Sequence, residues 1–441
     1  MDDRCTSIAE KGGGLLYQTV EKMISFLLFV IFTTNIVADE SVKYAAVIFR
    51  HGDRTPVQPY PTDPWRNESL WPVKFGELTN VGKRQHYALG KWLRQRYSHL
   101  LSDAFDPTEI YIRSTDVDRT LMSAQANLAG MYPPKSKTVW NTEINWQPIP
   151  VHTVPELEDE LLAMRKPCPA YDTELERVMH SKPYKERLRK YQHLMDYLSA
   201  YSGMKVKDYY DIVDIYSTLY IETLYNFTLP NWTQSVYPDE MREPAFKTET
   251  GSPLLSRLKV GPLLKHIMTH MSDTLSGDKK SHKVVMYSGH DLTVGSILNA
   301  LGLYDGNCPV YTSTIFIELV KANKTGEHFV RISYRNSTEI VEPYILKIPF
   351  CGEVCPVERF KKLYDNLVSV NWEEECKKQF PALLGASFIV GLCLFITIYV
   401  VHKIHFARVY NQYRSVYVGR KNLSYQSIQK PTVVLSNPLH A

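Results

Sequence analysis

Three short apolar runs, far apart along the chain, each stop abruptly at charged or titratable residues. The first, residues 42–49, is rich in Val, Ile, Tyr and Phe and ends at Arg50. The second, residues 109–112, ends at Arg113, and the third, residues 283–288, ends at a Gly-His-Asp triplet. Runs of this length and composition predict β-strands. Because ligands of open α/β sheets bind just outside the carboxyl ends of the strands, we expect these three ends to build one site.

Helices are expected to reach the same place. One is predicted after the loop that contains His51, and another after Thr115. The N-terminus of a helix carries partial positive charge and attracts anions. Both helices would therefore add positive potential to the crevice at the strand ends.

Between the second and third runs the pattern becomes helical. Residues 155–256 are rich in Tyr, Leu, Lys, Glu and Met, and residues 186–195 read ERLRKYQHLM. We therefore expect a helical subdomain inserted within an α/β body, with most of its aromatic residues serving ordinary packing. No internal repeat or low-complexity linker interrupts the sequence.

A second kind of apolar segment lies near the carboxyl end. Residues 382–401 contain no charged residue, and twenty residues are enough to cross a bilayer core of about 30 Å. A buried core helix is the alternative interpretation, but the length, position and basic flank favour a transmembrane helix. The positive-inside rule then predicts that residues 402–441 form a cytosolic tail.

The apolar segment at residues 24–37, followed by Ala38, is typical of the hydrophobic region of a secretory signal peptide. The preceding 22 residues are unusually long and acidic for such a peptide, and Met23 would make a conventional start. Residues 1–22 are therefore interpreted as an upstream extension, with an uncleaved signal anchor as the alternative. The predicted organisation is an extension and signal peptide at 1–38, a luminal domain at 39–381, a transmembrane helix at 382–401 and a tail at 402–441.

Composition agrees with a globular protein and argues against nucleic-acid binding. Of the 441 residues, 44% are hydrophobic and 22% are charged, which is ordinary for a protein with a large core. The net charge is +4, but residues 402–441 carry six Lys or Arg and no acidic residue, which leaves −2 for the remainder. A basic nucleic-acid-binding face is therefore not indicated.

The residues at the strand ends suggest phosphoryl chemistry. Arg50, His51 and Arg54 place an imidazole between two guanidiniums. Arg offers forked, permanently charged donors that suit phosphate oxygens, and His can act as a nucleophile or a proton carrier. A single Arg or His at such a position would be interpreted as a solvated loop charge. Three such clusters at three strand ends favour a phosphate site.

The motifs themselves resemble a known family. The Arg-His-Gly-Asp-Arg-Thr-Pro run from Arg50, the Arg-Ser-Thr-Asp-Val-Asp-Arg-Thr run from Arg113 and the Gly-His-Asp run from Gly289 occur in the order typical of the histidine phosphatase superfamily. The match is to its acid-phosphatase branch, closest to the animal lysosomal and prostatic members, and covers roughly residues 41–380. The family implies an α/β fold of the phosphoglycerate-mutase-like type, with a central mixed sheet flanked by helices and a helical cap beside the active site.

The resemblance also implies roles for particular residues. His51 would be the nucleophile that forms a phosphohistidine, and Asp291 would protonate the leaving group. Asp291 follows His290 directly, whereas the inositol-polyphosphate phosphatases commonly have a glutamate in His-Ala-Glu, so broad hydrolysis of phosphate monoesters is expected. An aspartate donates a proton only when protonated, which makes an acidic optimum a hypothesis. The substrate phosphate would be bound by Arg50, Arg54, Arg113 and His290. No cofactor or metal is expected.

The cysteines suit an oxidising compartment. By family resemblance, Cys168 pairs with Cys376 and Cys351 pairs with Cys355. Cys308 is then left over, because Ile221 stands at the best match to its usual partner, and we expect it to be buried and inert. The absence of a repeated Cys-x-x-Cys pattern argues against zinc.

Short motifs bear on processing and location. Five Asn-x-Ser/Thr sequons precede the transmembrane segment, at Asn67, Asn226, Asn231, Asn323 and Asn336. The tail contains two Tyr-x-x-hydrophobic patterns, at Tyr413 and Tyr425, which predict contact with sorting adaptors. We therefore expect a single-pass type I membrane protein of the endosomal or lysosomal lumen. Display at the cell surface and release by cleavage are the alternatives.

A binding-only glycoprotein and a metal site are the other interpretations of this sequence. A surface glycoprotein that keeps the fold but only binds ligands would be expected to lose the nucleophile, an arginine or the acid, and all are present. His266 and His270 could share one helix face, but metal ligation needs a third ligand that the sequence does not show. The resemblance also suggests a homodimer. Phosphate monoesters are the expected substrates.

Overall fold

The computed structural model describes residues 40–242, 249–278, 281–377 and 403. The chain divides into two compact units, residues 1–379 and 380–441, and all that follows concerns the first. The predicted signal peptide, transmembrane helix and tail tyrosines Tyr413 and Tyr425 lie outside the described residues. Within those residues, no helix combines the length and the apolar composition that crossing a membrane requires.

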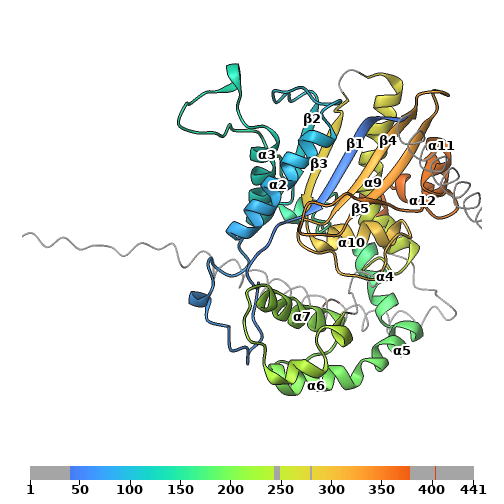
Figure 1. Ribbon diagram of the computed structural model, residues 1–441. Helices are drawn as coiled ribbons and strands as arrows, with labels where there is room; N and C mark the ends of the chain where they lie inside the picture. Colours follow the sequence, from blue (N-terminus) through green and yellow to red (C-terminus); the bar gives the residue numbers. More distant parts are fainter. Residues whose placement is uncertain (1–39, 243–248, 279–280, 378–402, 404–441) are drawn as a thin grey trace, which may run out of the picture. The chain divides into compact units, whose positions relative to one another are not determined.

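A seven-stranded mixed sheet forms the centre of the domain (Figure 1). Its strands are β1 (Glu40–Arg50), β2 (Ile110–Ser114), β3 (Val284–Gly289), β4 (Thr314–Ala322), β5 (His328–Arg335), β6 (Tyr344–Ile345) and β7 (Val354–Pro356). The order is β2-β3-β1-β4-β5-β6, and β7 also pairs with β5. Strands β2, β3 and β1 are parallel to one another, and the remaining pairs are antiparallel. The predicted mixed α/β sheet is confirmed.

The register aligns the ends of the three parallel strands. Arg50 lies opposite Gly289, and Ser114 lies opposite Ser288. Just beyond, the His51 amide donates to the Gly289 carbonyl oxygen at 3.0 Å. The three apolar runs found in the sequence therefore end at one edge of the sheet, as predicted.

Helices cover both faces of the sheet, which explains why β1 reads as a continuous apolar run. Its alternate residues pack against α2 (Asn80–Arg96) and α3 (Asp118–Met131) on one face. The other alternate residues pack against α9 (Pro253–Ser276) and α10 (Asp291–Ala300) on the opposite face (Figure 1). Three short helices follow the sheet near the carboxyl end of the domain: α11 (Val357–Leu363), α12 (Asp365–Val368) and α13 (Trp372–Glu375).

The described part of the predicted helical region includes four successive α-helices, of which the last three supply most of a separate hydrophobic core. They are α4 (Pro169–Met179), α5 (Lys182–Lys190), α6 (Gln192–Ser202) and α7 (Tyr209–Leu224). Their core cluster is separate from the two that sandwich the sheet, and Tyr60 of the loop after β1 joins it. We call these four helices the cap. Figure 1 shows α7 as the cap helix that faces the end of the sheet.

The domain contains two disulfides, one between residues far apart in the sequence and one between near neighbours. Cys168, which precedes α4, is bonded to Cys376, and Cys351 is bonded to Cys355. Both pairings match the prediction. Cys308 is a free cysteine, and it is partly rather than fully buried.

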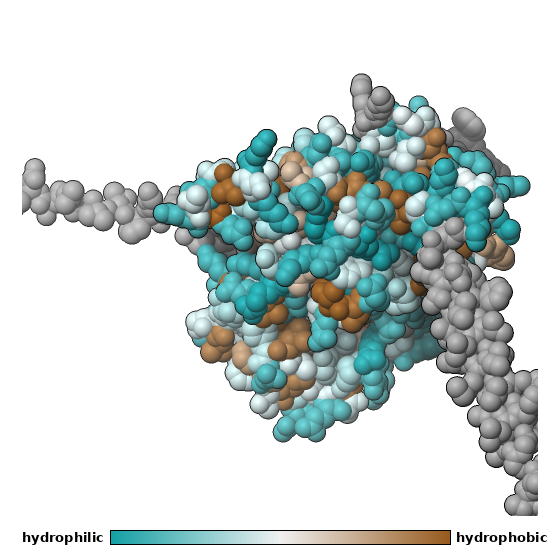
Figure 2. Space-filling view, turned by 45° about the horizontal axis from the view of Figure 1, so that its top comes forward, coloured by the Kyte–Doolittle hydropathy of each residue, from teal (hydrophilic) through white to brown (hydrophobic). Residues whose placement is uncertain are grey.

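The surface is mixed in polarity. The face drawn in Figure 2 carries mostly polar side chains with separate groups of apolar ones, which is ordinary for a folded domain. Four of the sequon asparagines are exposed, and Asn336 is partly buried with its side-chain oxygen accepting a hydrogen bond from the Val310 amide. Glycosylation at these five positions stays a prediction.

A buried carboxyl pair joins the loop after β1 to the cap. Asp63 is 2% exposed and Glu222 of α7 is fully buried. Burial and the neighbouring Asp63 carboxyl raise the pKa of Glu222 to about 9. Burial also raises the pKa of Asp63, and Arg66 is the cation that opposes this. The hydroxyls of Tyr60 and Tyr237 are the other titratable groups near Glu222. At acidic and neutral pH, Glu222 is therefore protonated in the folded protein.

This pair should make the domain more stable in acid than at neutral pH. Between about pH 4.5, where Glu222 titrates when unfolded, and about pH 9, only the folded state holds the proton. Stability should therefore fall as pH rises through this window, by about 1 kcal/mol per pH unit. Thermal unfolding at pH 5 and pH 8 measures the effect, and in Glu222→Gln the difference between the two pH values should shrink. An unchanged difference would exclude this pair as its source.

Candidate active site

His51 lies directly after β1 and is 2% exposed. Its ring Nδ1 is 2.8 Å from the Gly52 carbonyl oxygen. A carbonyl oxygen can only accept, so Nδ1 carries the hydrogen and Nε2 keeps its lone pair. Gly52 is required here, because a Cβ atom on it would lie 2.5 Å from the backbone oxygen of Gly82 in α2. The N-terminal turn of α2 thus packs on the His51 loop, as expected.

Positive groups surround His51. Burial lowers the pKa of His51 well below its usual value, and the charges of Arg119, Arg50, His290 and Arg54 lower it further. The rings of His51 and His290 have centroids 5.6 Å apart and meet edge to face. Burial and the surrounding cations therefore favour the neutral form of the His51 imidazole over its protonated form. A neutral imidazole among cations is equipped to attack an anion.

Asp291 stands at the first residue of α10, immediately after His290. Its Oδ2 atom lies 2.8 Å from an Nη atom of Arg50. Partial burial raises the pKa of Asp291, but the charges of Arg50, Arg54 and His290 outweigh this and the pKa is lowered. Asp291 is therefore ionised in the protein without substrate.

Arg50 and Arg54 are held by several contacts. Arg50 donates to the Pro309 carbonyl oxygen at 2.6 Å, and its guanidinium lies 4.4 Å from the ring centroid of Tyr311. Arg54 donates to its neighbour's carbonyl oxygen and, at 3.4 Å, to the hydroxyl of Ser217 on α7. The cap therefore reaches the cation cluster directly.

His290 is linked to the second motif. Its Nε2 atom lies 3.0 Å from the hydroxyl of Thr115, which follows β2. Burial lowers the pKa of His290 well below its usual value, and Arg119 contributes, while Asp291 opposes the shift. The structure thus brings His51, Arg50, Arg54, His290 and Asp291 together at one edge of the sheet, as the sequence predicted.

Arg113 has different surroundings. Its guanidinium lies 2.6 Å from Oδ1 of Asp159, a fully buried carboxylate. Asp159 also accepts hydrogen bonds from the amides of residues 161–163. The charge of Arg113 acts on His266 and Tyr287, on the α9 face of the sheet. The structure therefore gives Arg113 a role in holding the 159–163 turn.

Arg119, rather than the predicted Arg113, is the arginine of the second motif that lies beside His51. It lies in the first turn of α3, and its charge is the largest electrostatic influence on His51 after burial. Burial and the neighbouring Arg54 lower the pKa of Arg119 to about 10, so it stays charged at acidic and neutral pH. The sequence could have indicated Arg119, because this residue belongs to the same motif as Arg113 and follows the two aspartates of that motif. The strand pattern could not show which of the two arginines faces the site.

Exchanging these two arginines for alanine should separate their roles. Arg119→Ala should lower kcat/KM about 10²-fold and weaken inhibition by inorganic phosphate, because a cation beside the reacting phosphate is lost. Arg113→Ala should instead lower the melting temperature, because Asp159 would be left as an unpaired buried charge. Phosphate inhibition constants and thermal melts measure both effects. Weaker phosphate binding in Arg113→Ala than in Arg119→Ala would reverse the assignment.

The pair His266 and His270 does lie one turn apart on α9, with ring centroids separated by 4.7 Å. The ring Nδ1 of His266 lies 2.8 Å from the Tyr287 hydroxyl, so a protein group already occupies it. Within the described ranges, no group of three or more His, Cys, Asp or Glu side chains is arranged to hold a metal ion.

Comparisons with known proteins agree with this geometry. Residues 41–335 match the model of the histidine phosphatase superfamily (branch 2). The chain is 40% identical over 369 residues to prostatic acid phosphatase of Mus musculus, covering 82% of this chain and 96% of that protein. It is 36% identical over 380 residues to lysosomal acid phosphatase of Xenopus laevis, covering 84% and 87%. Among solved structures, the phytase of Citrobacter braakii superposes with a TM-score of 0.57 at 16% identity, covering 77% of this chain and 100% of that one. This last likeness concerns the fold alone.

Proposed function

The chain belongs to the histidine phosphatase superfamily (branch 2), and we propose that it is an acid phosphatase whose phosphohistidine intermediate forms on His51. The substrates are phosphate monoesters, and the products are an alcohol and inorganic phosphate. The observation that carries the proposal is the buried, neutral imidazole of His51 with a free Nε2 atom inside a cluster of cations.

The cation cluster binds and activates the phosphate. The nonbridging oxygens of a phosphate monoester carry two negative charges, and more charge develops on them during transfer. Arg50, Arg54, Arg119 and His290 supply donors from three separate strand ends. Because these groups are held by the fold before substrate arrives, little reorganisation is needed during the reaction.

The first chemical step forms a phosphorus–nitrogen bond. Nε2 of His51 attacks phosphorus, and the bond between phosphorus and the ester oxygen breaks. The electron pair of that bond stays on the ester oxygen, which takes a proton from Asp291. An alcohol leaves, and phosphohistidine remains.

The second step releases phosphate. A water molecule attacks phosphorus, the phosphorus–nitrogen bond breaks, and its electron pair returns to Nε2 of His51. Asp291, now ionised, accepts the proton of the water. The protein returns to its starting state, and inorganic phosphate dissociates.

Acidic pH favours the protonation state that the reaction requires of both His51 and Asp291. The lowered pKa of His51 keeps its imidazole unprotonated where an ordinary histidine would be charged. Asp291 must gain a proton, and the bound phosphate favours this because it competes for Arg50 and adds negative charge beside the carboxylate. The proposal therefore expects bound phosphate to replace the contact of 2.8 Å between Asp291 and Arg50 that the free protein makes.

A rapid-quench experiment tests the proposal. The full chain would be mixed with a radiolabelled aromatic phosphate monoester at pH 5 and quenched in alkali, where phosphohistidine survives. Acid-labile, alkali-stable label on a peptide containing His51, together with hydrolysis that is faster at pH 5 than at pH 8, is expected. Hydrolysis without any covalent label would contradict the proposed intermediate, and an absence of hydrolysis would contradict the function.

We also propose a cellular location and a membrane topology for the protein. The named relatives include lysosomal and prostatic acid phosphatases, and the two disulfides suit an oxidising compartment. The chain would be a single-pass type I protein of the endolysosomal lumen, anchored by residues 382–401 and sorted by adaptors at Tyr413 or Tyr425. Surface display and release are the alternatives. A homodimer is part of the same proposal.

A further inference from the structure

Arg335 is a buried arginine whose charge no carboxylate balances in the part of the chain that the structure describes. It is the last residue of β5 and is 1% exposed. Its Nη2 atom donates to the Thr312 carbonyl oxygen at 2.7 Å, whereas Nε and Nη1 have no hydrogen-bond partner among the described residues. Burial alone lowers the pKa of Arg335, to about 10. The side chain is therefore charged at acidic and neutral pH.

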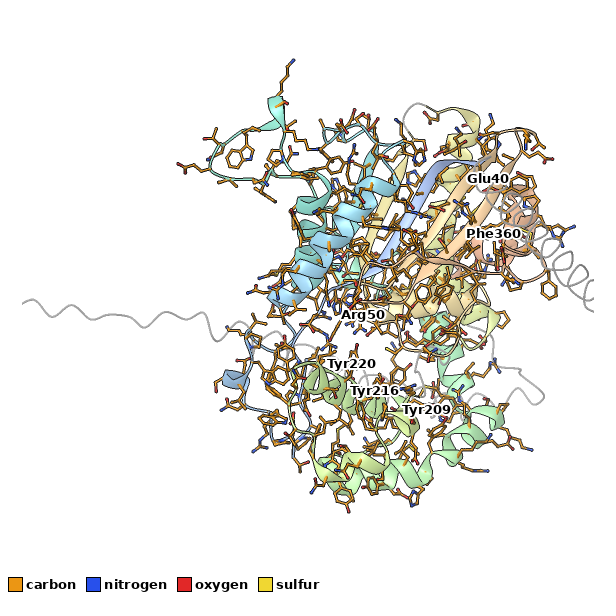
Figure 3. The ribbon with its side chains drawn as sticks, viewed as in Figure 1. Glu40, Arg50, Tyr209, Tyr216, Tyr220 and Phe360 are labelled. Atoms are coloured by element: carbon orange, nitrogen blue, oxygen red, sulfur yellow. A yellow bond between two sulfur atoms is a disulfide. The ribbon has the colours of Figure 1, made fainter. Side chains whose placement is uncertain are left out.

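Arg331, on the same strand, has the ordinary partners of a buried arginine. It stands four residues earlier and so lies on the same face of β5. Its guanidinium contacts the buried carboxylate of Glu318 at 3.0 Å and that of Glu40 at 3.1 Å. Figure 3 shows Glu40 and Arg50 at opposite ends of β1. The arginine toward the Glu40 end of the sheet is thus paired, and the arginine at the Arg50 end is not.

The register of the sheet places Arg335 behind the reacting residues. Arg335 lies opposite Thr314, and Thr314 lies opposite Phe49. Residues that lie opposite one another point to the same face of a sheet. On this face, the Phe49 ring packs against His86 of α2, with centroids 5.1 Å apart. Arg335 is therefore level with the last residues of β1, on the side covered by α2.

Thr312 connects Arg335 to the His51 loop. The Thr312 carbonyl oxygen accepts from Arg335, and the Thr312 amide donates to the His51 carbonyl oxygen at 3.2 Å. The next residue, Ser313, accepts from the Arg50 amide at 3.0 Å. Thr312 has a φ of 60°, a left-handed conformation that is strained for a β-branched residue. Arg335 therefore helps to hold the strained segment against which the backbone of Arg50 and His51 is fixed.

An unpaired buried charge lowers the stability of a fold, so its presence calls for an explanation. His86 does not balance it, because burial, with a contribution from Arg335, lowers the pKa of His86 to about 3 and leaves that ring neutral. The substrate phosphate is the negative group that comes to the other side of the Thr312 segment. For two unit charges about 10 Å apart at an effective dielectric constant of ~20, the interaction changes an affinity roughly tenfold.

We propose that Arg335 is a positioning residue of the phosphate site, and that its unpaired charge, held behind Thr312, strengthens the binding of doubly charged phosphate groups. The inference rests on the proposed phosphatase function. Arg335 does not touch the phosphate, which Arg50, Arg54 and Arg119 contact directly. Because the phosphoryl group and its partners keep the same total charge during transfer, the effect falls on KM more than on kcat.

Two inhibitors of different fixed charge test this role. At pH 5, sulfate carries two negative charges and methanesulfonate carries one. Arg335→Met removes the charge and keeps the length of the side chain. The inhibition constant of methanesulfonate should then rise about three- to tenfold, and that of sulfate by about the square of the same factor. Steady-state inhibition of the full chain at constant ionic strength measures both. An equal rise for the two ions, or no rise, would overturn the proposal.

Thermal unfolding separates this role from a structural one. Arg335→Met removes an unpaired buried charge, so its melting temperature should equal or exceed that of the wild type. Arg331→Met is the matched control and should lower the melting temperature, because it removes one of the two arginines that pair with fully buried Glu318. If Arg335→Met fails to fold, or melts lower with unchanged inhibition constants, Arg335 serves the fold and the proposal is overturned.

A conservative variant and a change of salt complete the test. Arg335→Lys keeps the charge and should keep the wild-type ratio of the two inhibition constants, whereas the ratio found in Arg335→Met would contradict a role for the charge. Replacing chloride with gluconate at constant ionic strength should leave the melting temperature of the wild type unchanged. A fall would mean that an anion from solvent already neutralises Arg335, which would also overturn the proposal.

Hydrolysis of an aromatic phosphate monoester distinguishes this inference from the function on which it rests. If the wild-type chain hydrolyses the ester and Arg335→Met keeps the wild-type ratio of inhibition constants, only the role of Arg335 is excluded. If the wild-type chain does not hydrolyse the ester, the phosphatase function itself fails.

Discussion

Replacing His51 with alanine is expected to abolish hydrolysis, with kcat/KM falling by about 10⁴-fold or more. The side chain supplies the atom that attacks phosphorus, and no other histidine takes its place. His290 is the nearest imidazole, but its Nε2 atom is already in contact with the Thr115 hydroxyl at 3.0 Å. Steady-state assays at pH 5 with an aromatic monoester measure the loss.

Phosphate binding should survive the same substitution. The arginines that surround His51 are held by contacts with Pro309, Ser217 and Asp291 rather than by His51 itself. Calorimetry with inorganic phosphate should therefore give a dissociation constant close to that of the wild type. His99→Ala, at an exposed position after α2, is the matched control and should keep full activity. Hydrolysis above about one per cent in His51→Ala would mean that another nucleophile reacts.

The second large effect is expected from Asp291→Asn, and its size should depend on the leaving group. An alkoxide is a strong base and cannot leave unless it is protonated, so alkyl monoesters should lose about 10²- to 10⁴-fold in kcat. A nitrophenolate is a weak base and leaves without a proton, so a nitrophenyl ester should lose much less. Comparing kcat for the two substrates measures the difference.

The pH profile gives an independent reading of the same residue. In the wild type, activity should decline as pH rises, because Asp291 must be protonated to donate. In Asp291→Asn, this decline should disappear for the nitrophenyl ester. Asp103→Asn, at a side chain that is 96% exposed, should leave the profile unchanged. Equal losses for alkyl and nitrophenyl esters would assign proton donation to another group.

Much of the site could be predicted because its reactive residues lie directly after the carboxyl ends of strands. The parallel strands β1, β2 and β3 are short apolar runs followed by charged motifs, and parallel strands place their carboxyl ends at one edge. Local sequence therefore predicted that His51, His290 and Asp291 would meet. The two disulfides were also predicted, although only through resemblance to the family.

The direction of the Arg113 side chain could not be predicted in the same way. Successive strand residues point to opposite faces, so a motif that crosses from β2 into α3 offers several arginines in different directions. The contact with buried Asp159 decides the direction of Arg113, and the first turn of α3 brings Arg119 to His51. Neither the contact nor the turn can be derived from spacing along the chain.

The sequence by itself determined the strands, the motifs at their ends and the class of reaction, because these depend on neighbouring residues and on the chemistry of single side chains. Only the tertiary structure decided which arginine of the second motif lies beside His51 and that Asp63 and Glu222 share a buried site. The physical reason is that these relations join segments far apart in the chain. Burial and nearby charge then set both the direction and the protonation of each side chain.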